Sequence, residues 1–178
     1  MFHGVQFYDE DTHLCQAVSA FFARGLLLGH PVLGIATPTH RAGIEAQLSA
    51  RGFHVPALVR ARQLTLLDAV TVLAELTPQG PVDDDRLIRL LAPLIERVEA
   101  AGAQLHAYGE MVDLLWKRGQ AQTALSLEAH WSAAVDRHHF RLLCGYSRGN
   151  GYIDRDVDNI CAHHSHVICD ASDASLTS

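Results

Sequence analysis

Alternation of apolar stretches with amphipathic stretches is the feature of this chain that most constrains its fold. Short apolar runs recur along the sequence, and segments with apolar residues at three- and four-residue spacing lie between them. Strands that are separated by helices pair in parallel and are covered on both faces. The sequence therefore predicts an α/β fold with three layers, in which helices cover both faces of a mostly parallel central sheet of about five strands. These strands are expected over residues 3–8, 31–37, 63–69, 103–108 and 140–146.

Caps mark the expected helices. Glycine readily adopts the left-handed conformation that ends many helices. It is expected to end four of them, at Gly29, Gly52, Gly102 and Gly119. Thr37 is expected to cap one helix and Asp84 or Asp85 another, because short polar side chains accept hydrogen bonds from the first free N–H groups. A last helix is expected over residues 154–166, followed by a short edge strand at residues 167–169.

The bulk composition indicates one globular domain. The chain has 178 residues, of which 48% are hydrophobic and 19% charged, and no linker or repeat divides it. We expect residues 1–168 to form the domain and residues 169–178 a polar tail. The net charge of −6 and the absence of a Lys/Arg block argue against nucleic-acid binding. No apolar run is long enough to span a membrane and no signal peptide is evident, so we expect a soluble, cytoplasmic protein.

The first strand-to-helix turn lacks the features of a nucleotide site. A P-loop needs glycines, a lysine and a hydroxyl to hold phosphates. Here the turn reads "YDEDTHL" (residues 8–14) and contains three carboxylates, with neither glycine nor lysine. Carboxylates repel a triphosphate, so ATP is not expected as a cofactor. The acids also suit a helix N-terminus, and simple capping is the competing interpretation.

Three stretches of the sequence resemble the MEDS domain, the sensory domain named for methanogens, methylotrophs and the repressor DcmR. They are "HGVQFYDEDTHLCQAVSAFFARGLLLGHPVLGIATPTHR", "AYGEMVDLLWKRG" and "LLCGYS…ICAHHSHVI", and the likeness extends from His3 to about Ile168. The resemblance implies a RecA/KaiC-like α/β domain that has lost its nucleotide-binding motifs. It also implies a sensor of small, hydrocarbon-like molecules, of a kind often joined to histidine kinase or DNA-binding modules in bacteria and archaea.

The resemblance also marks residues at the strand ends and near the end of the chain. In open parallel sheets the ligand crevice lies outside the carboxyl ends of the strands. Tyrosines with few charges suit a small, mainly apolar ligand; the competing interpretation of the turn after the fourth strand is a purely structural one. His164 or His166 corresponds to a marked histidine of the family. The predicted ligand-binding residues are His3, Tyr8, Asp9, Glu10, Tyr108 and Glu110.

The segment "CAHHSHVIC" (residues 161–169) is the most metal-like pattern in a chain that has 12 histidines. On a helix, residues three apart lie on one face, as two ligands of one metal would. Cys161 with His164, and His163 with His166, have this spacing. A histidine near a helix C-terminus is also favoured without any metal. We therefore keep a metal or haem site on Cys161, His163, His164 and His166 as an alternative.

These observations favour a non-catalytic sensory domain. The sequence shows neither a nucleophile-elbow motif nor a spaced pair of carboxylates, so no enzymatic activity is expected. The expected partners are a small-molecule ligand and a signalling protein such as a histidine kinase or transcription regulator, with a homodimer as a further possibility. Two alternatives stay open: a ligand-free protein-interaction module on a former ATPase scaffold, and the metal- or haem-responsive sensor.

Overall fold

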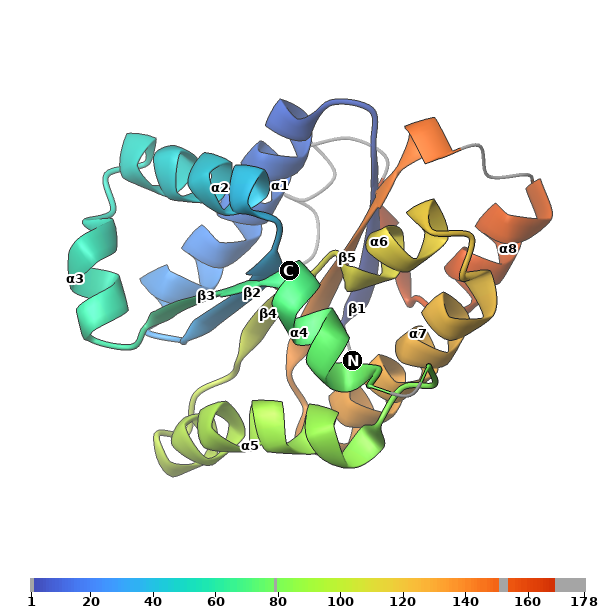
Figure 1. The fold of residues 1–178 in the computed structure, drawn as a ribbon. Helices are drawn as coiled ribbons and strands as arrows, with labels where there is room; N and C mark the ends of the chain where they lie inside the picture. The colour runs from blue at the N-terminus through green and yellow to red at the C-terminus, as the bar shows by residue number, and fades with distance from the viewer. Residues whose placement is uncertain (1, 79, 151–153, 169–178) are drawn as a thin grey trace.

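A single sheet of six parallel strands forms the centre of the protein (Figure 1). The structure is a computed structural model and describes residues 2–78, 80–150 and 154–168. The strand order is β3-β2-β4-β5-β1-β6. The strands are β1 (His3–Tyr8), β2 (Val32–Ala36), β3 (Leu64–Asp68), β4 (His106–Gly109), β5 (Arg141–Ser147) and β6 (His166–Ile168). The predicted α/β class is confirmed.

Helices cover both faces of the sheet and complete the three layers (Figure 1). One face is packed by α1 (Asp11–Leu27), α2 (Pro38–Ala50) and α3 (Val55–Arg60). The other is packed by α4 (Ala69–Leu76), α5 (Asp84–Ala100), α6 (Met111–Lys117), α7 (Ala121–His138) and α8 (Asp154–Ala162), with the short turn η1 (Arg148–Asn150) before α8. None of the helices in the described part of the chain is long and apolar enough to cross a membrane.

Strand periodicity assigns each side chain of β1 to one of the two cores. Val5 and Phe7 belong to the core under α4–α8, whereas Tyr8 belongs to the core under α1–α3. Successive side chains of a strand point to opposite faces. His3 therefore lies on the same side as Val5, and Tyr8 lies on the other. Two predicted ligand-binding residues of one strand are thus on different faces of the sheet.

The predicted helix ends agree with the structure where glycine decides them. Gly29, Gly52, Gly102 and Gly119 all have positive φ values, of 75°, 89°, 60° and 70°. Such values strain other residues but not glycine. At the other ends, Thr37 is the N-cap residue of α2 as predicted, although its side chain makes no capping hydrogen bond. Asp83, and neither Asp84 nor Asp85, caps α5, because its Oδ1 accepts the N–H of Arg86 at 3.1 Å.

The end of the domain differs from the prediction. The last helix stops at Ala162 instead of residue 166, and residues 166–168 form the edge strand β6. The N–H of Ser165 donates to the carbonyl of His3 at 2.7 Å, and β6 pairs in parallel with β1 from Gly4 onward. These sheet contacts replace helical hydrogen bonds, so the helical spacing assumed for residues 161–166 is wrong. Residues 169–178, the predicted tail, lie outside the described part.

Candidate functional site

Glu110 is the centre of a polar cluster at the carboxyl ends of the strands, which we call the rim cluster (Tyr8, His40, Tyr108, Glu110 and Asp113). Its side chain is buried and accepts hydrogen bonds from the Tyr108 hydroxyl at 2.8 Å and from the N–H of Thr37 at 2.5 Å. His40 Nδ1 lies 2.5 Å from Oε2, the oxygen that also accepts from Tyr108, whereas Thr37 binds Oε1. Each oxygen of Glu110 therefore has a partner inside the protein.

His40 bridges two carboxylates. While Nδ1 contacts Glu110, Nε2 lies 3.1 Å from Asp11 Oδ1. Burial lowers the pKa of His40, but the hydrogen bonds and negative charges of Glu110 and Asp11 outweigh it, and the pKa is raised. For Glu110, burial raises the pKa. The hydrogen bonds from His40 and the Thr37 N–H and the charge of His40 lower the pKa by more than burial raises it, so the net shift is downward. Both shifts favour an ion pair between an imidazolium and a carboxylate.

Asp113 holds the opposite side of the rim cluster. It accepts the N–H of Ser147 at 3.0 Å and contacts Lys117, the only lysine of the chain, at 2.7 Å. The Tyr8 hydroxyl donates to Asp113 Oδ2 at 3.4 Å. The sequence interpretation placed His40 at the carboxyl ends of the strands but did not include it among the ligand-binding residues, and it missed Asp113. Asp113 is one buried position of the helix that follows the "AYGEM" stretch, which is a signal that the sequence did contain.

The structure brings together three of the six residues predicted to bind a ligand. Tyr8, Tyr108 and Glu110 share the rim cluster, but all three are buried and bonded to protein groups. Asp9 and Glu10 are exposed beside the cluster; Asp9 contacts Arg148 at 3.5 Å, and Glu10 is the N-cap residue of α1 through its backbone. His3 lies at the opposite end of β1 and on the opposite face. Contact of these residues with a ligand stays a prediction.

A second buried carboxylate, Glu128 of α7, lies among His3, Cys144 and His164. We call these four residues the inner cluster. The His3 Nε2 atom is 3.2 Å from Glu128 Oε2 and 3.5 Å from Cys144 Sγ, and Cys144 Sγ is also 3.5 Å from Glu128 Oε2. His164 Nε2 is 3.4 Å from Glu128 Oε1. All four donor atoms lie within 4.8 Å of one another.

The inner cluster is buried. The Glu128 and His164 side chains have no exposed surface, and Cys144 is almost fully buried. Burial raises the pKa of Glu128, but the hydrogen bonds and charges of His164 and His3, where these rings are protonated, outweigh burial and lower the pKa. Burial raises the pKa of the Cys144 thiol well above its ordinary value, and Glu128 adds to this rise.

Only one of the four predicted metal ligands joins the inner cluster. His164 does so because the chain leaves α8 at Ala162 and turns toward β1. Cys161 is a half-buried residue of α8, His163 follows it in the turn, and exposed His166 of β6 packs its ring on Phe2, with centroids 4.8 Å apart. Among the described residues, the inner cluster is the one group of three or more metal-type side chains that converge.

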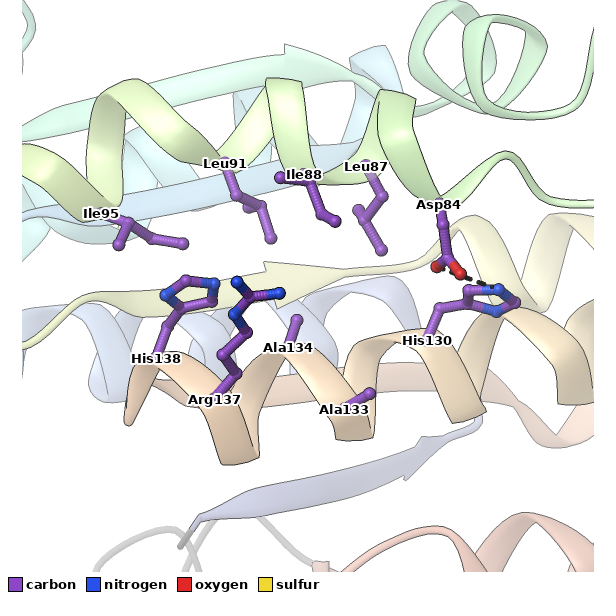
Figure 2. A pocket seen from close by; sticks show the side chains of 10 residues that line it. All are labelled: Asp84, Leu87, Ile88, Leu91, Ile95, His130, Ala133, Ala134, Arg137 and His138. Atoms are coloured by element: carbon purple, nitrogen blue, oxygen red, sulfur yellow. Dashed lines mark ion pairs between the residues drawn. The ribbon is translucent and has the colours of Figure 1, made fainter.

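A hollow between α5 and α7 offers space for a ligand (Figure 2). Its volume is about 180 Å³. Apolar side chains of α5 and two alanines of α7 line most of it. Figure 2 shows the side chains of His138 and Arg137 toward one end, where Arg137 reaches into the groove opposite Leu91. At the other end His130 Nε2 pairs with Asp84 Oδ1 at 3.0 Å. The apolar lining consists of Leu87, Ile88, Leu91, Ile95, Ala133 and Ala134.

A hollow between α4 and α5 is larger, about 280 Å³, but has a different character. Three of its six lining residues, Glu75, Arg86 and Arg89, carry charges. An apolar molecule gains little from such walls, because their charges would lose water on contact. The hollow between α5 and α7, which we call the α5–α7 groove, is the better match to a small apolar ligand.

The fold and the residues of the first turn define a class of protein, the three-layer parallel α/β domains with an acidic first strand-to-helix turn. Comparison with known protein families then finds a match to the MEDS domain, the methanogen/methylotroph, DcmR sensory domain, over residues 2–165. The chain belongs to this family. A search of curated proteins found no match.

Proposed function

We propose that this protein is a non-catalytic sensory domain that binds a small, mainly apolar molecule in the α5–α7 groove and thereby regulates a protein partner. The family supports a signal-sensing role. The observation that carries the choice of ligand is the groove itself, whose mostly apolar lining includes a few polar groups (Figure 2). Ligand pockets commonly combine an apolar lining with a few polar groups that orient the ligand.

The size of the groove limits the ligand. A space of about 180 Å³ suits a molecule of a few heavy atoms, such as a short hydrocarbon or a halocarbon. Ile88 is 47% exposed at this surface, an unusual exposure for an isoleucine that a bound apolar ligand would reduce. Each buried methylene contributes about 0.8 kcal/mol, so a ligand of this size binds weakly unless the polar groups also engage it.

Regulation requires that the ligand prefer one of two states. A ligand shifts a conformational equilibrium only by its difference in affinity for the two conformations. Here the α5–α7 groove lies between two helices, so a bound molecule would favour one spacing of α5 against α7. We propose that this spacing is the signal that a histidine kinase or transcription regulator reads, either on the same chain or as a separate protein.

The acidic turn supports a scaffold of RecA/KaiC type that no longer binds nucleotide. Asp9 and Asp11 are exposed at the start of α1, where a P-loop would present amide groups and a lysine to phosphate. We propose that ATP is not a ligand. Isothermal titration calorimetry with ATP and magnesium should show no binding; a dissociation constant in the micromolar range would contradict this part of the proposal.

Thermal shift measurements test the groove. A panel of short alkanes and halocarbons should raise the melting temperature of the wild-type protein, and Ala134→Phe should abolish this rise because its ring fills the groove. Ala46→Phe is the matched control, since Ala46 is exposed on α2, away from the groove. If the two variants respond to the panel equally, the α5–α7 groove is not the binding site; if wild-type protein responds to no compound, the interaction-module alternative gains support.

A further inference from the structure

The inner cluster has the dimensions of a tetrahedral metal site. Zinc binds imidazole nitrogen at about 2.0–2.1 Å and thiolate sulfur at about 2.3 Å, which places the ligand atoms of a tetrahedron about 3.3–3.7 Å apart. His3 Nε2 and Cys144 Sγ lie 3.2 and 3.5 Å from Glu128 Oε2 and 3.5 Å from each other. His164 Nε2 lies 3.4 Å from the other carboxylate oxygen, Oε1, and the four residues keep their ligand atoms within 4.8 Å of one another. The donors come from β1, α7, β5 and the turn after α8, so four separate segments converge on one point.

The outer nitrogen of each histidine is already engaged. His164 Nδ1 lies 2.6 Å from the carbonyl oxygen of Ile160 and must donate its hydrogen to it. Ser132 donates its own hydroxyl to the carbonyl of His163, so its oxygen is left to accept the Nδ1–H of His3 at 3.1 Å. In the neutral form of each ring, Nε2 therefore carries the lone pair, and both lone pairs face the cluster. Metal-bound histidines are oriented in this way.

This arrangement leaves an unsatisfied atom when no ion is present. His164 Nε2 is buried and has no hydrogen-bond partner among the described residues, although Glu128 Oε1 lies 3.4 Å away. A neutral His164 would place a lone pair against a carboxylate oxygen. A buried polar atom without a partner costs roughly 1–3 kcal/mol and calls for an explanation. A cation between the two atoms supplies one.

Charge and donor type agree with a zinc-class ion. On binding, the Cys144 thiol would release its proton, as metal-bound thiols do, despite the burial that keeps it protonated otherwise. One divalent cation, one thiolate, one carboxylate and two neutral imidazoles sum to zero charge, which suits a buried site. The Tyr146 hydroxyl donates to Glu128 Oε1 at 2.7 Å and helps to orient the carboxylate. Four convergent donors leave no open plane for a porphyrin.

We propose that His3 Nε2, Glu128, Cys144 Sγ and His164 Nε2 form a buried binding site for one divalent transition-metal ion of the zinc class. The site ties the segment after α8 to β1 and α7. This inference does not depend on the ligand of the α5–α7 groove, which lies on the other side of α7 from Glu128. The ion is a part of the folded domain or a second input to the sensor.

Cobalt titration of chelator-treated protein tests the site directly. Co²⁺ should bind one ion per chain and give near-ultraviolet thiolate-to-cobalt charge transfer together with visible bands of tetrahedral intensity. Zn²⁺ should displace it. Absence of stoichiometric binding to natively folded wild-type protein, as judged by circular dichroism, would overturn the proposal, and so would bands without a thiolate contribution.

Matched variants assign the ligands. Cys144→Ser should remove the charge-transfer band and weaken binding by at least about 100-fold, the upper effect of losing a metal's supporting residue. Cys161→Ser should keep the charge-transfer band and the wild-type affinity, since Cys161 lies outside the inner cluster. His164→Gln and His166→Gln form a second pair: His164→Gln should weaken binding, whereas His166→Gln should leave the affinity unchanged. Equal behaviour within both pairs would overturn the assignment.

Alkylation of the wild-type protein covers the case in which a variant does not fold. In mild denaturant, iodoacetamide should modify Cys144 at least tenfold more slowly with Zn²⁺ than after chelation, as read by peptide mass spectrometry. Cys161 provides the internal control, because its modification rate should change little. A rate at Cys144 that is independent of Zn²⁺ would overturn the proposal even without any variant.

Discussion

The rim cluster and the inner cluster are both built on a buried glutamate beside histidine, yet they differ in where the imidazole nitrogens point. At the rim, both nitrogens of His40 face carboxylates, those of Glu110 and Asp11. In the inner cluster, the outer nitrogens of His3 and His164 face a hydroxyl and a carbonyl, and only the inner nitrogens face Glu128. An imidazole between two carboxylates is most stable when both of its nitrogens are protonated. A neutral imidazole whose Nδ1–H donates to a group outside the cluster has its lone pair on Nε2, which faces the cluster.

The same pair of residue types therefore serves two purposes. At the rim the positive charge that Glu110 needs is carried by the protein itself, and backbone and tyrosine donors complete its shell. Around Glu128 the protein supplies two imidazoles, a thiol and one tyrosine hydroxyl, and His164 Nε2 has no hydrogen-bond partner among the described residues. The orientation of the second nitrogen, more than the presence of a His–Glu pair, separates a structural ion pair from a metal site.

Removal of each glutamate gives the largest expected effect. Glu110→Leu leaves His40, the Tyr108 hydroxyl and the Thr37 N–H without their shared acceptor, so we expect a loss of about 3–5 kcal/mol in the free energy of unfolding. Metal-free Glu128→Leu should lose less, about 1–3 kcal/mol, because His3 and His164 can remain neutral and the groups that lose an acceptor are the Tyr146 hydroxyl and the weakly donating Cys144 thiol. Urea denaturation of both variants with chelator measures the difference; equal losses would remove the distinction between the clusters.

Zinc should stabilise one cluster and not the other. At a free concentration about 100 times the dissociation constant, a bound ion adds about 2.7 kcal/mol to the free energy of unfolding. The gain should vanish in Glu128→Leu and persist in Asp11→Asn, which changes the rim only. Chemical denaturation with and without Zn²⁺ measures both. A gain that persists in Glu128→Leu would place the ion elsewhere in the protein.

The sequence predicted the layers and most helix ends because these depend on local patterns. Apolar runs located the strands, and glycines located the ends of α1, α2, α5 and α6. The sequence did not predict the short helix α3, because six residues are too few to show a helical periodicity. The helical spacing of residues 161–166 gave a wrong prediction. The Ser165 N–H donates to the His3 carbonyl, and this contact with the sheet ends the helix early.

The inner cluster could be predicted only in part. His3 and His164 were both expected to be functional, but in two different sites. Glu128 does leave a signal: it occupies the buried stripe of α7 together with Ala124, Leu127, Trp131 and Val135, where an acid needs an explanation. Its convergence with Cys144 depends on how α7 packs on β5, and no local pattern encodes that packing.

Gly145 provides a smaller test of the rim cluster. A Cβ at this position would lie 2.7 Å from the Tyr108 hydroxyl oxygen, so Gly145→Ala should push that hydroxyl away from Glu110. Overpacking of this kind costs about 1–3 kcal/mol. Gly149→Ala is the control, because its nearest neighbour, Ser147 Oγ, would be at an ordinary 3.6 Å. Tyr108→Phe should make the cost of Gly145→Ala smaller; additive losses in the double variant would show that the two residues are not coupled.

The pH dependence of the rim ion pair should give the smallest effect, because it reports only the change in charge of His40 and Glu110. The raised pKa of His40 means that its contribution to stability is present below the ordinary histidine pKa of about 6.5 and is lost as the pH rises through the folded-state pKa. The lowered pKa of Glu110 means that its contribution is present above about pH 4.3 and is lost as the pH falls. The stability difference between wild type and His40→Gln, measured by urea denaturation with chelator, should therefore be largest between about pH 4.3 and 6.5 and decline above it. His13→Gln, a change at an exposed histidine of α1, should give a difference near zero throughout, and a His40→Gln difference that does not vary between pH 5 and 9 would mean that His40 is not charged at the rim.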